Sequence, residues 1–412
     1  MKTNSCVGGR KVVETAKEAE SKMIGRIHYM YLKKLIVSFI TVGMIAVLAA
    51  CGSPAPDTKD SSSENAGNEQ QTAPESADYG QDTVAVVNGR LIRQDEFEYF
   101  VRYNVDTRAE NGEQITDWEE EISDGVTVSD SVKEDALDWF IYAGGIHQQA
   151  ARLGIELQDE DRAALEEQWK QFTGRYDSPE AAEEALAEQH CTPELYKYIL
   201  ETQYLSDRVF DSLYGEYGCN ITDAECAVMT EGDGYLMAKH ILLLTVKMND
   251  DGTQEELPEK EKAEKLEMIR ELKTQIDGAE AGERQALFDE LMKEHSEDTG
   301  LEAYPEGYLF QEGDMVEEFY DATMALEEGA VSDIVQTTYG YHLIMRLPIN
   351  YDVIPSAYSM YTAYGYDYLT LRYLCADEAF GASAQQWMER VEVEKTELYE
   401  SLNVKDLILE EK

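Results

Sequence analysis

A charge-free apolar run of 16 residues, Leu35–Ala50, most limits what this chain can fold into. It follows a short basic start at Lys33 and Lys34, which is the layout of an export signal peptide. A helix needs about 20 apolar residues to cross a bilayer, and a Gly-Ser-Pro segment follows Cys51 directly. We therefore favour cleavage over a membrane-spanning helix that is never cut, and expect the folded protein to begin after this run.

The end of the run, Leu48-Ala49-Ala50-Cys51, resembles the lipobox of bacterial lipoproteins. That resemblance implies that residues 30–50 are a lipoprotein signal peptide. It also implies that Cys51 is lipidated, becomes the first residue of the mature chain, and anchors the protein to the membrane. Residues 1–29 are interpreted as an N-terminal extension of uncertain status, because a start at Met30 would place the basic and apolar regions where a signal peptide needs them.

A polar segment, residues 51–81, follows the lipobox and is rich in Ser, Asn, Gln, Pro and acidic residues. It has almost no large apolar side chains, so it cannot bury a core. We expect it to be a flexible tether that lets the folded part stand off the membrane.

The net charge of the chain is -49, and the first 50 residues hold eight Lys or Arg against three Asp or Glu, so the remainder carries -54. Such a field repels phosphate backbones, and we expect no nucleic-acid partner. The acidic residues do not show the spacing of a calcium loop, and the cysteines lack C-x-x-C spacing or a His at zinc-finger distance. We therefore expect no metal and no cofactor.

Four cysteines lie beyond the lipobox, and export would permit disulfides among them. The sequence leaves open the three full pairings and, equally, four free thiols. The cysteines are Cys191, Cys219, Cys226 and Cys375.

The folded part opens with two short apolar segments, residues 84–87 and 91–92, on either side of Asn88-Gly89. This pattern predicts a β-hairpin with a primed turn. Asp95 is expected to cap the next helix, with Glu98 three residues on as in a capping box. Residues 132–213 then read as mostly helical, with breaks expected at Gly144-Gly145, Gly154, Gly174 and Thr192-Pro193.

The opening pattern V-A-x-V-N-G-x-x-I-x-x-x-E-F resembles the chaperone domain of SurA- and PrsA-type foldases. The resemblance implies that residues 82–235 form a helical chaperone domain. The tyrosine-rich C-terminal segment, residues 349–412, is too small to bury its own core. By the same resemblance it folds back as a helical segment that packs on the chaperone domain, and we expect a polar helix at residues 385–400.

The stretch between these two parts, residues 236–348, combines predicted strands and helices with several short motifs. An apolar strand is predicted at 236–246, a polar loop at 248–259, and helices at 260–276 and 284–295. The motifs "HSEDTG" and "EGYLFQEGDMVEEF…TTYGYHLIMRL" follow, and with them the resemblance to parvulins is close. It implies a small antiparallel sheet flanked by helices, inserted into the chaperone domain, so the whole chain is assigned to the α+β class.

Three residues match the catalytic positions of parvulins. His240 matches the histidine of the first strand, His342 the histidine of T-x-x-G-x-H, and Asp298 lies where the family carries Asp or Cys. The resemblance implies that the two histidines form a buried hydrogen-bonded pair and that Asp298 tunes the electrostatics near the substrate carbonyl. A histidine on an apolar strand is as often a structural core residue, so a mainly structural role stays open for both.

Three further residues match substrate-binding positions of the family. Met315 and Phe319 fit G-x-M-x-x-x-F and are expected at i and i+4 on a helix, lining the proline pocket, and Tyr339 stands just before the glycine of the last motif. One segment departs from the family pattern. Where many parvulins have G-G-D-L-G-x-F, residues 304–310 read Tyr-Pro-Glu-Gly-Tyr-Leu-Phe, so the leucine that usually walls the pocket has no match.

The resemblance implies a peptidyl-prolyl cis-trans isomerase and chaperone, lipid-anchored on the extracytoplasmic face of the membrane in a single-membrane Gram-positive envelope. Its partners would be unfolded or partly folded exported polypeptides that contain proline. The alternative is a holdase chaperone whose parvulin domain is catalytically idle. A solute-binding lipoprotein would show alternating βα units along the whole chain, which this sequence does not show.

Overall fold

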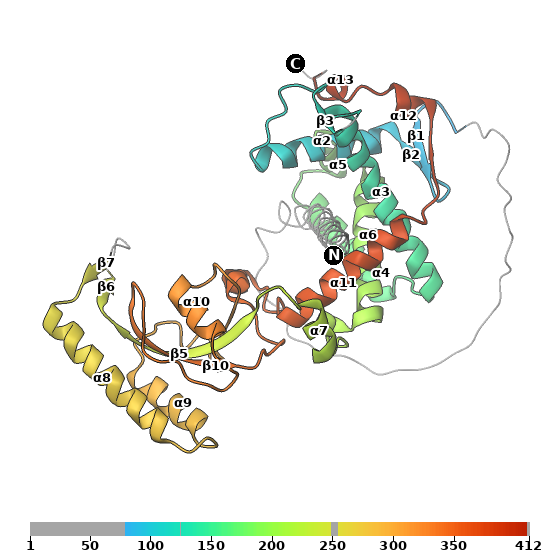
Figure 1. The fold of residues 1–412 in the computed structure, drawn as a ribbon. Helices are drawn as coiled ribbons and strands as arrows, with labels where there is room; N and C mark the ends of the chain where they lie inside the picture. The colour runs from blue at the N-terminus through green and yellow to red at the C-terminus, as the bar shows by residue number, and fades with distance from the viewer. Residues whose placement is uncertain (1–78, 124, 249–253, 410–412) are drawn as a thin grey trace, which may run out of the picture. The chain divides into compact units, whose positions relative to one another are not determined.

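The computed structural model describes residues 79–123, 125–248 and 254–409. The predicted extension, signal peptide and lipidation site at Cys51 lie outside these residues, as does the predicted tether except for residues 79–81. Along the described ranges, no helix combines the length and the apolar character needed to cross a membrane. The described part of the chain divides into two compact units: the first runs to Ser212 and resumes at Phe380, and the second spans Leu213–Ala379 (Figure 1).

The first unit contains a small sheet with the strand order β11-β1-β2. Strands β1 (Thr83–Val87) and β2 (Arg90–Arg93) form the predicted hairpin, and both turn residues have positive φ, 47° at Asn88 and 82° at Gly89, as a primed turn requires. The hairpin is therefore confirmed. Strand β11 (Val393–Lys395) pairs antiparallel with β1, so a segment near the C-terminus completes the sheet that begins the fold.

Helices make up most of the first unit, and three of the four predicted breaks between them are confirmed. Helix α3 ends just before Gly154, α4 ends just before Gly174, and α6 begins at Pro193. A second small hairpin, β3 with β4, precedes α3. The bounds are α2 (Gln94–Glu110), β3 (Glu121–Ser123), β4 (Val126–Thr127), α3 (Val128–Leu153), α4 (Asp159–Thr173), α5 (Pro179–Ala187), α6 (Pro193–Tyr214), α11 (Leu371–Met388), α12 (Glu397–Ser401) and α13 (Val404–Leu409). The last two residues of α6 and the first half of α11, up to Ala379, belong to the second unit.

The predicted break at Gly144-Gly145 is wrong, because α3 runs through both residues without interruption. A Cβ atom on Gly144 would lie 3.0 Å from Cγ1 of Val87. The glycine therefore allows a close approach between α3 and β1 and does not end the helix. Two adjacent glycines in a sequence can mark either role, and only the tertiary packing distinguishes them.

Two further local predictions in the first unit are wrong. The cap of α2 is not Asp95 with Glu98; the carboxylate of Glu96 accepts the backbone N–H of Arg93 at 3.1 Å instead, and Asp95 lies in the first turn. The polar helix predicted at residues 385–400 is also absent as such, because α11 ends at Met388 and β11 follows. Pairing of β11 with β1 supplies backbone hydrogen bonds that override the helix propensity of this segment.

The second unit is built on a four-stranded antiparallel sheet with the order β8-β5-β10-β9. The predicted strand appears as β5 and the two predicted helices as α8 and α9, so these three are confirmed. With the helical first unit, they also confirm the predicted α+β class. The bounds are β5 (Leu236–Leu244), α8 (Glu259–Gly278), α9 (Arg284–His295), β8 (Tyr308–Phe310), α10 (Glu317–Met324), β9 (Val335–Gln336) and β10 (Gly340–Leu347).

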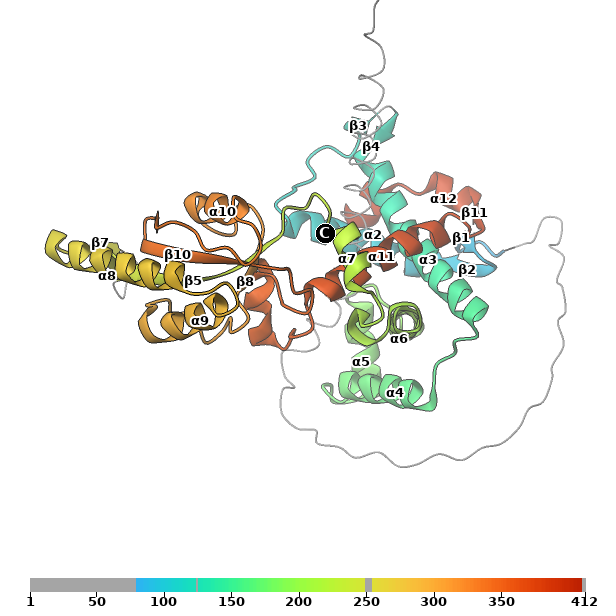
Figure 2. The same cartoon turned by 60° about the horizontal axis from the view of Figure 1, so that its bottom comes forward.

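Each face of this sheet is covered by its own helices, as Figures 1 and 2 show. Alternate residues of β5 and β10, such as Ile241 and Leu343, pack with Ile269 of α8 and Phe288 of α9. The residues of opposite parity, such as Ala238 and Ile344, pack with Phe319 of α10. Because side chains alternate along a strand, even-numbered residues at the centre of β5 and β10 face α10.

The remaining elements of the second unit are short. The predicted polar loop at 248–259 lies partly outside the described residues, and its last part forms a strand, β7, that pairs with β6. All four cysteines beyond Cys51 are free thiols in the structure. The bounds are η1 (Glu216–Gly218), α7 (Asp223–Met229), β6 (Val246–Met248), β7 (Gln254–Glu256) and η2 (Ser356–Tyr364).

Candidate active site

The two predicted site histidines meet on the α10 face of the sheet. In the register of β5 and β10, His240 lies opposite Ile344 and His342 lies opposite Leu242, so the two histidines are diagonal neighbours on one face. Their Nδ1 atoms are 3.2 Å apart and their ring centroids 5.2 Å apart. Strand register alone therefore brings together two residues that are 102 positions apart in the sequence.

Asp298 lies against the outer nitrogen of this pair. Its Oδ2 is 2.9 Å from Nε2 of His240 and also accepts the hydroxyl of Tyr308 at 2.6 Å, while its Oδ1 accepts the backbone N–H of Gly300 at 2.9 Å. The side chain of Asp298 is 14% exposed. The carboxylate is thus held by three donors in a mostly dry setting, where hydrogen bonds to a charged group are stronger than in water.

These contacts decide the charge of Asp298. Burial by itself raises the pKa of this carboxyl, but the hydrogen bonds from His240, Tyr308 and Gly300 favour the ionised form and outweigh burial, so the pKa falls to about 2. Burial and the same hydrogen bond raise the pKa of the Tyr308 phenol. At neutral pH the site therefore holds a fixed carboxylate beside a neutral phenol.

His342 is buried and neutral. Burial, together with the neighbouring His240, lowers its pKa to about 3. An ionised carboxylate can only accept, so when both imidazoles are neutral the proton of His240 lies on Nε2, and His342 donates from Nδ1 to Nδ1 of His240. The hydroxyl of Thr337 then donates to Nε2 of His342 at 2.9 Å. Each group therefore donates to the next, and the hydrogen-bonded chain runs from Thr337 through His342 and His240 to Asp298.

An apolar surface lies beside this hydrogen-bonded chain. The Phe319 ring lies edge-on to both imidazoles, with centroid distances of 5.1 Å to His240 and 5.6 Å to His342. Met315 is partly buried and packs against the apolar cluster that contains Phe319, Phe310 and Ile344. The expectation that Met315 lies on a helix is wrong, because α10 begins at Glu317, but the turn before α10 still brings it to the cluster that contains Phe319.

Tyr339 differs from the other five predicted site residues. Its side chain is exposed, and its hydrogen bonds to the site run through its main chain: its N–H donates to Oγ1 of Thr337 at 3.1 Å, and its carbonyl accepts the N–H of Thr245 at 2.9 Å. The structure thus brings His240, Asp298, His342, Met315 and Phe319 together. It places Tyr339 in the β9–β10 turn, next to the threonine that orients His342.

The sequence interpretation missed Tyr308, Thr337 and Gly300. Thr337 is the threonine of the T-x-x-G-x-H motif, so the motif itself carried a signal for it. Tyr308 lies in the segment that departs from the family pattern, which identified an unusual position but not its contact. A Cβ atom on Gly300 would lie 2.1 Å from the Tyr308 hydroxyl, so the glycine makes room for that hydrogen bond.

One comparison with known proteins covers the part of the chain that contains these residues. Residues 240–347 match the family model "Rotamase: PPIC-type PPIASE domain", which contains every residue named above for the site. The second unit therefore carries a parvulin-type domain. In the described part of the chain, no group of three or more His, Cys, Asp or Glu is placed to hold a metal ion.

Similarity extends beyond this domain. Over 227 residues, 53% of this chain, the sequence is 27% identical to "Foldase protein PrsA" of Staphylococcus aureus (strain bovine RF122 / ET3-1), and the match spans 63% of that protein's length. Among solved structures, a peptidylprolyl isomerase (PrsA) from Bacillus cereus matches at 17% identity and TM-score 0.27, covering 72% of this chain and 100% of its own. A foldase protein (PrsA) from Lactococcus lactis matches at 13% identity and TM-score 0.28, covering 80% and 98%. The chain is PrsA-like in sequence.

Proposed function

We propose that this chain is an extracytoplasmic, membrane-anchored foldase that catalyses cis/trans isomerisation of X-Pro bonds in exported proteins and also acts as a chaperone. Its clients are unfolded or partly folded polypeptides that contain proline. The observation that carries the proposal is the hydrogen-bonded chain of Thr337, His342, His240 and Asp298 beside the Phe319 ring, within the residues that match the PPIase family.

The reaction needs a twisted amide and no bond cleavage. The X-Pro C–N bond has partial double-bond character, with a rotation barrier of about 18–20 kcal/mol that makes isomerisation slow enough to limit folding. In the planar ground state the carbonyl oxygen carries more negative charge than in the twisted state. A site that disfavours negative charge on this oxygen destabilises the planar state relative to the twisted state and so lowers the barrier. A thousandfold acceleration requires only about 4 kcal/mol.

The candidate site has the groups for that task. Met315 and Phe319 would hold the proline ring on a dry surface, which disfavours the charge-separated planar form. The fixed charge of Asp298, next to the substrate carbonyl, would act in the same direction without forming a covalent bond. His240, Tyr308 and the backbone of Gly300 hold this carboxylate in place, and His342 orients His240, so little reorganisation is needed during rotation.

The organisation of the chain is part of the proposal. Residues 82–235 and 349–412 would form the chaperone part, and residues 236–348 the inserted isomerase domain. The pairing of β11 with β1 supports this division, because it joins the two ends of the folded chain in one sheet. The lipobox pattern at Cys51 and the similarity to a foldase called PrsA support the anchored, extracytoplasmic location.

A protease-free assay of cis-to-trans conversion on Glu-Pro and Ala-Pro peptides tests the activity. We expect the parent chain to accelerate at least one peptide, and Met315→Ala and Asp298→Ala to lower kcat/KM by about tenfold or more, which corresponds to about 1.4 kcal/mol each. Met324→Ala is the matched control, because this methionine ends α10 but is exposed. Loss of activity in the control equal to that in Met315→Ala would contradict the proposed pocket.

A holdase with an idle parvulin domain is the second candidate. The departure at residues 304–310 favours it, because a tyrosine that binds Asp298 lies in the segment where the pocket leucine of the family is missing. If the parent chain accelerates none of the tested peptides yet suppresses aggregation of an unfolded protein, the holdase replaces the isomerase.

A further inference from the structure

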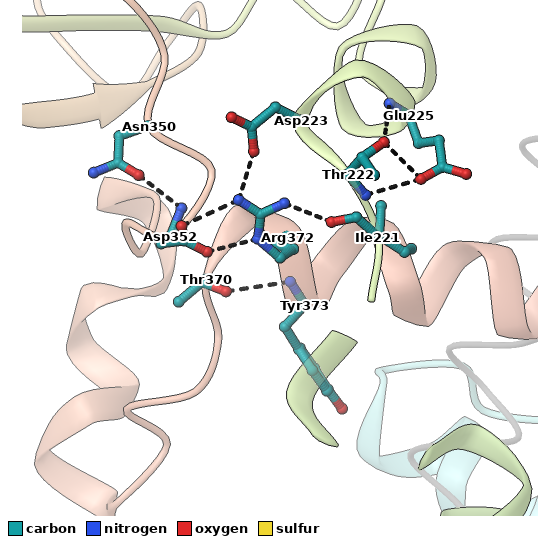
Figure 3. A network of polar contacts seen from close by, with 9 residues as sticks. All are labelled: Ile221, Thr222, Asp223, Glu225, Asn350, Asp352, Thr370, Arg372 and Tyr373. Carbon is teal, nitrogen blue, oxygen red and sulfur yellow. Dashed lines mark hydrogen bonds and ion pairs between the residues drawn. The ribbon is translucent and has the colours of Figure 1, made fainter. Parts of the chain in front are cut away.

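An open pocket of about 920 Å³ lies in the second unit and shares no lining residue with the His240–Asp298 site. Two segments far apart in the sequence form it, residues 216–223 around η1 and the start of α7, and residues 352–372 before and into α11. Arg372 joins the two segments, as Figure 3 shows. We call this site the Arg372 pocket.

The Arg372 guanidinium makes four hydrogen bonds within the protein. Its Nε and Nη2 donate to the two carboxylate oxygens of Asp352 at 2.6 and 3.1 Å, Nη2 also donates to Asp223 at 2.7 Å, and Nη1 donates to the carbonyl of Ile221 at 2.6 Å (Figure 3). The arginine side chain is only 13% exposed. Four of its five N–H groups are therefore used within the protein, and its role is to hold the two carboxylates in fixed positions.

The carboxylates face solvent, unlike the arginine that holds them. The side chains of Asp223 and Asp352 are 75% and 64% exposed. Glu216 and Asp367 also line the pocket, so four carboxylates stand against one guanidinium and the net charge of the lining is -3. A pocket of this charge attracts cations.

The cation that fits is not a bare metal ion. No set of three or more His, Cys, Asp or Glu in the residues that the structure describes is grouped closely enough to hold one. Carboxylates spread over a pocket of this volume suit an extended organic cation, which can meet several of them at once.

An aromatic surface completes the pocket. The rings of Tyr217 and Tyr368 stack with a centroid distance of 5.2 Å and an interplanar angle of 23°, and Tyr217 is 53% exposed. Tyrosine faces attract guanidinium and ammonium groups through the ring quadrupole. Carboxylates beside stacked tyrosines therefore match both parts of an arginine or lysine side chain, its charge and its flat or aliphatic surface.

We infer that the Arg372 pocket binds Arg- or Lys-bearing segments of unfolded polypeptide clients. This deepens the proposed function, on which it rests, by naming a client feature that is separate from proline. Charge complementarity selects this occupant, because the pocket is anionic and the chain as a whole carries -49. The site would raise the local concentration of clients near the isomerase domain through weak contacts, without taking part in the rotation.

Binding of a fluorescein-labelled, proline-free peptide to the full chain, followed by anisotropy, tests the inference. We compare an arginine-containing peptide with the same peptide carrying citrulline, which keeps the shape but not the charge. The arginine peptide is expected to bind the parent about fivefold or more tightly. The double variant Asp223→Asn, Asp352→Asn should remove most of that difference in affinity, because it removes two negative charges from the pocket. The fold should be preserved, because the asparagine oxygens can still accept hydrogen bonds from Arg372.

Two variants make the test specific. Tyr217 has a φ of 53°, a region that asparagine tolerates, so Tyr217→Asn removes the ring without a new backbone conflict and should weaken the arginine peptide about threefold. Glu328→Gln removes an exposed carboxylate elsewhere in the same unit and should bind like the parent. The exposed thiol of Cys219 lines the pocket, so the arginine peptide should also slow its alkylation by N-ethylmaleimide.

The inference is overturned if the arginine and citrulline peptides bind equally, if Glu328→Gln weakens binding as much as the pocket variants, or if Cys219 reacts at the same rate with and without peptide. Isomerase activity on a short, uncharged Ala-Pro peptide is measured on the same samples. The pocket variants should retain it. A parent that binds the arginine peptide but lacks isomerase activity would contradict the proposed isomerase and leave this inference standing.

Discussion

Two regions of the second unit use the same kinds of group in opposite settings. At the His240–Asp298 site, a carboxylate that is mostly buried is held by imidazole, phenol and backbone donors beside the Phe319 ring. At the Arg372 pocket, carboxylates that are mostly exposed are held by one guanidinium beside the Tyr217 ring.

Burial decides what a fixed carboxylate can do in these two settings. In a dry site its field acts at nearly full strength on a bound amide, and its position must be exact to a fraction of an ångström. In an open pocket, water and salt screen the same charge, so it can recruit a cation weakly but cannot polarise a bond. The first region suits catalysis and the second suits capture.

Truncating the aromatic residue of each region should give the largest contrast. Phe319→Ala removes a fully packed ring and should lower the free energy of unfolding by about 3–5 kcal/mol. Tyr217→Asn, at an exposed ring, should change it by no more than about 0.5 kcal/mol. Urea unfolding of both variants measures the two free energies, and equal losses would contradict the distinction between a packed and an exposed ring.

The pH dependence of stability should come from the buried region. The pKa of His342 is about 3 in the folded chain and 6.5 in the unfolded chain, so the unfolded state binds more protons between these values. The free energy of unfolding should therefore fall by a few kcal/mol as the pH drops from about 6.5 to about 3.

His342→Gln should flatten that fall, as followed by thermal unfolding across this pH range. Asp298 adds to the loss only below its unfolded pKa of 3.8, as the pH approaches its folded pKa of about 2. Glu328→Gln, at an exposed carboxylate outside both regions, is the control and should keep the parent profile. A His342→Gln profile as steep as the parent's would show that this histidine is not held neutral.

Tyr308→Phe tests how the hydrogen bond from Tyr308 affects the position and the pKa of the Asp298 carboxylate. It removes one hydrogen bond to Asp298 and keeps the ring, so kcat/KM should fall about three- to tenfold and the carboxyl pKa of Asp298 should rise. Carbon-13 NMR of the Asp298 carboxyl measures the pKa independently of activity. Tyr304→Phe, whose ring lies 4.3 Å from that of Tyr308, is the matched control. An unchanged Asp298 pKa would remove Tyr308 from the account.

Salt should give the smallest effect and affect mainly the exposed region. Raising NaCl from about 0.05 M to about 0.5 M shortens the screening length to a few ångströms, so binding of the arginine peptide should weaken about three- to fivefold. The isomerase kcat/KM on an uncharged Ala-Pro peptide should change less than twofold, because Asp298 is shielded from the solvent. A similar salt response at both regions would contradict the distinction.

The sequence predicted the buried region well because regular structure places its residues. Strand parity puts His240 and His342 on one face, and short motifs fix the loops that bring Asp298 and Phe319 to them. The hydrogen bond from Tyr308 to Asp298 could not be predicted in this way, because it depends on the space beside Gly300.

Interpretation of local signals was less reliable where tertiary packing decides. A helix break was predicted at Gly144-Gly145, but Gly144 allows a close approach between α3 and β1. A helix was predicted at 385–400, but this segment contains a strand that pairs with β1. The Arg372 pocket could not be predicted at all, since it joins residues about 150 positions apart through side-chain contacts that no periodicity encodes.

The central claim is that X-Pro rotation takes place against Met315 and Phe319, beside Asp298. NMR of the chain with carbon-13 methionine methyl groups, mixed with an excess of Ala-Pro peptide, tests it directly. We expect cis/trans exchange cross-peaks of the peptide, together with a shift of the Met315 methyl signal and none for Met324. Absence of enhanced exchange, or exchange with an unmoved Met315 signal, would contradict it.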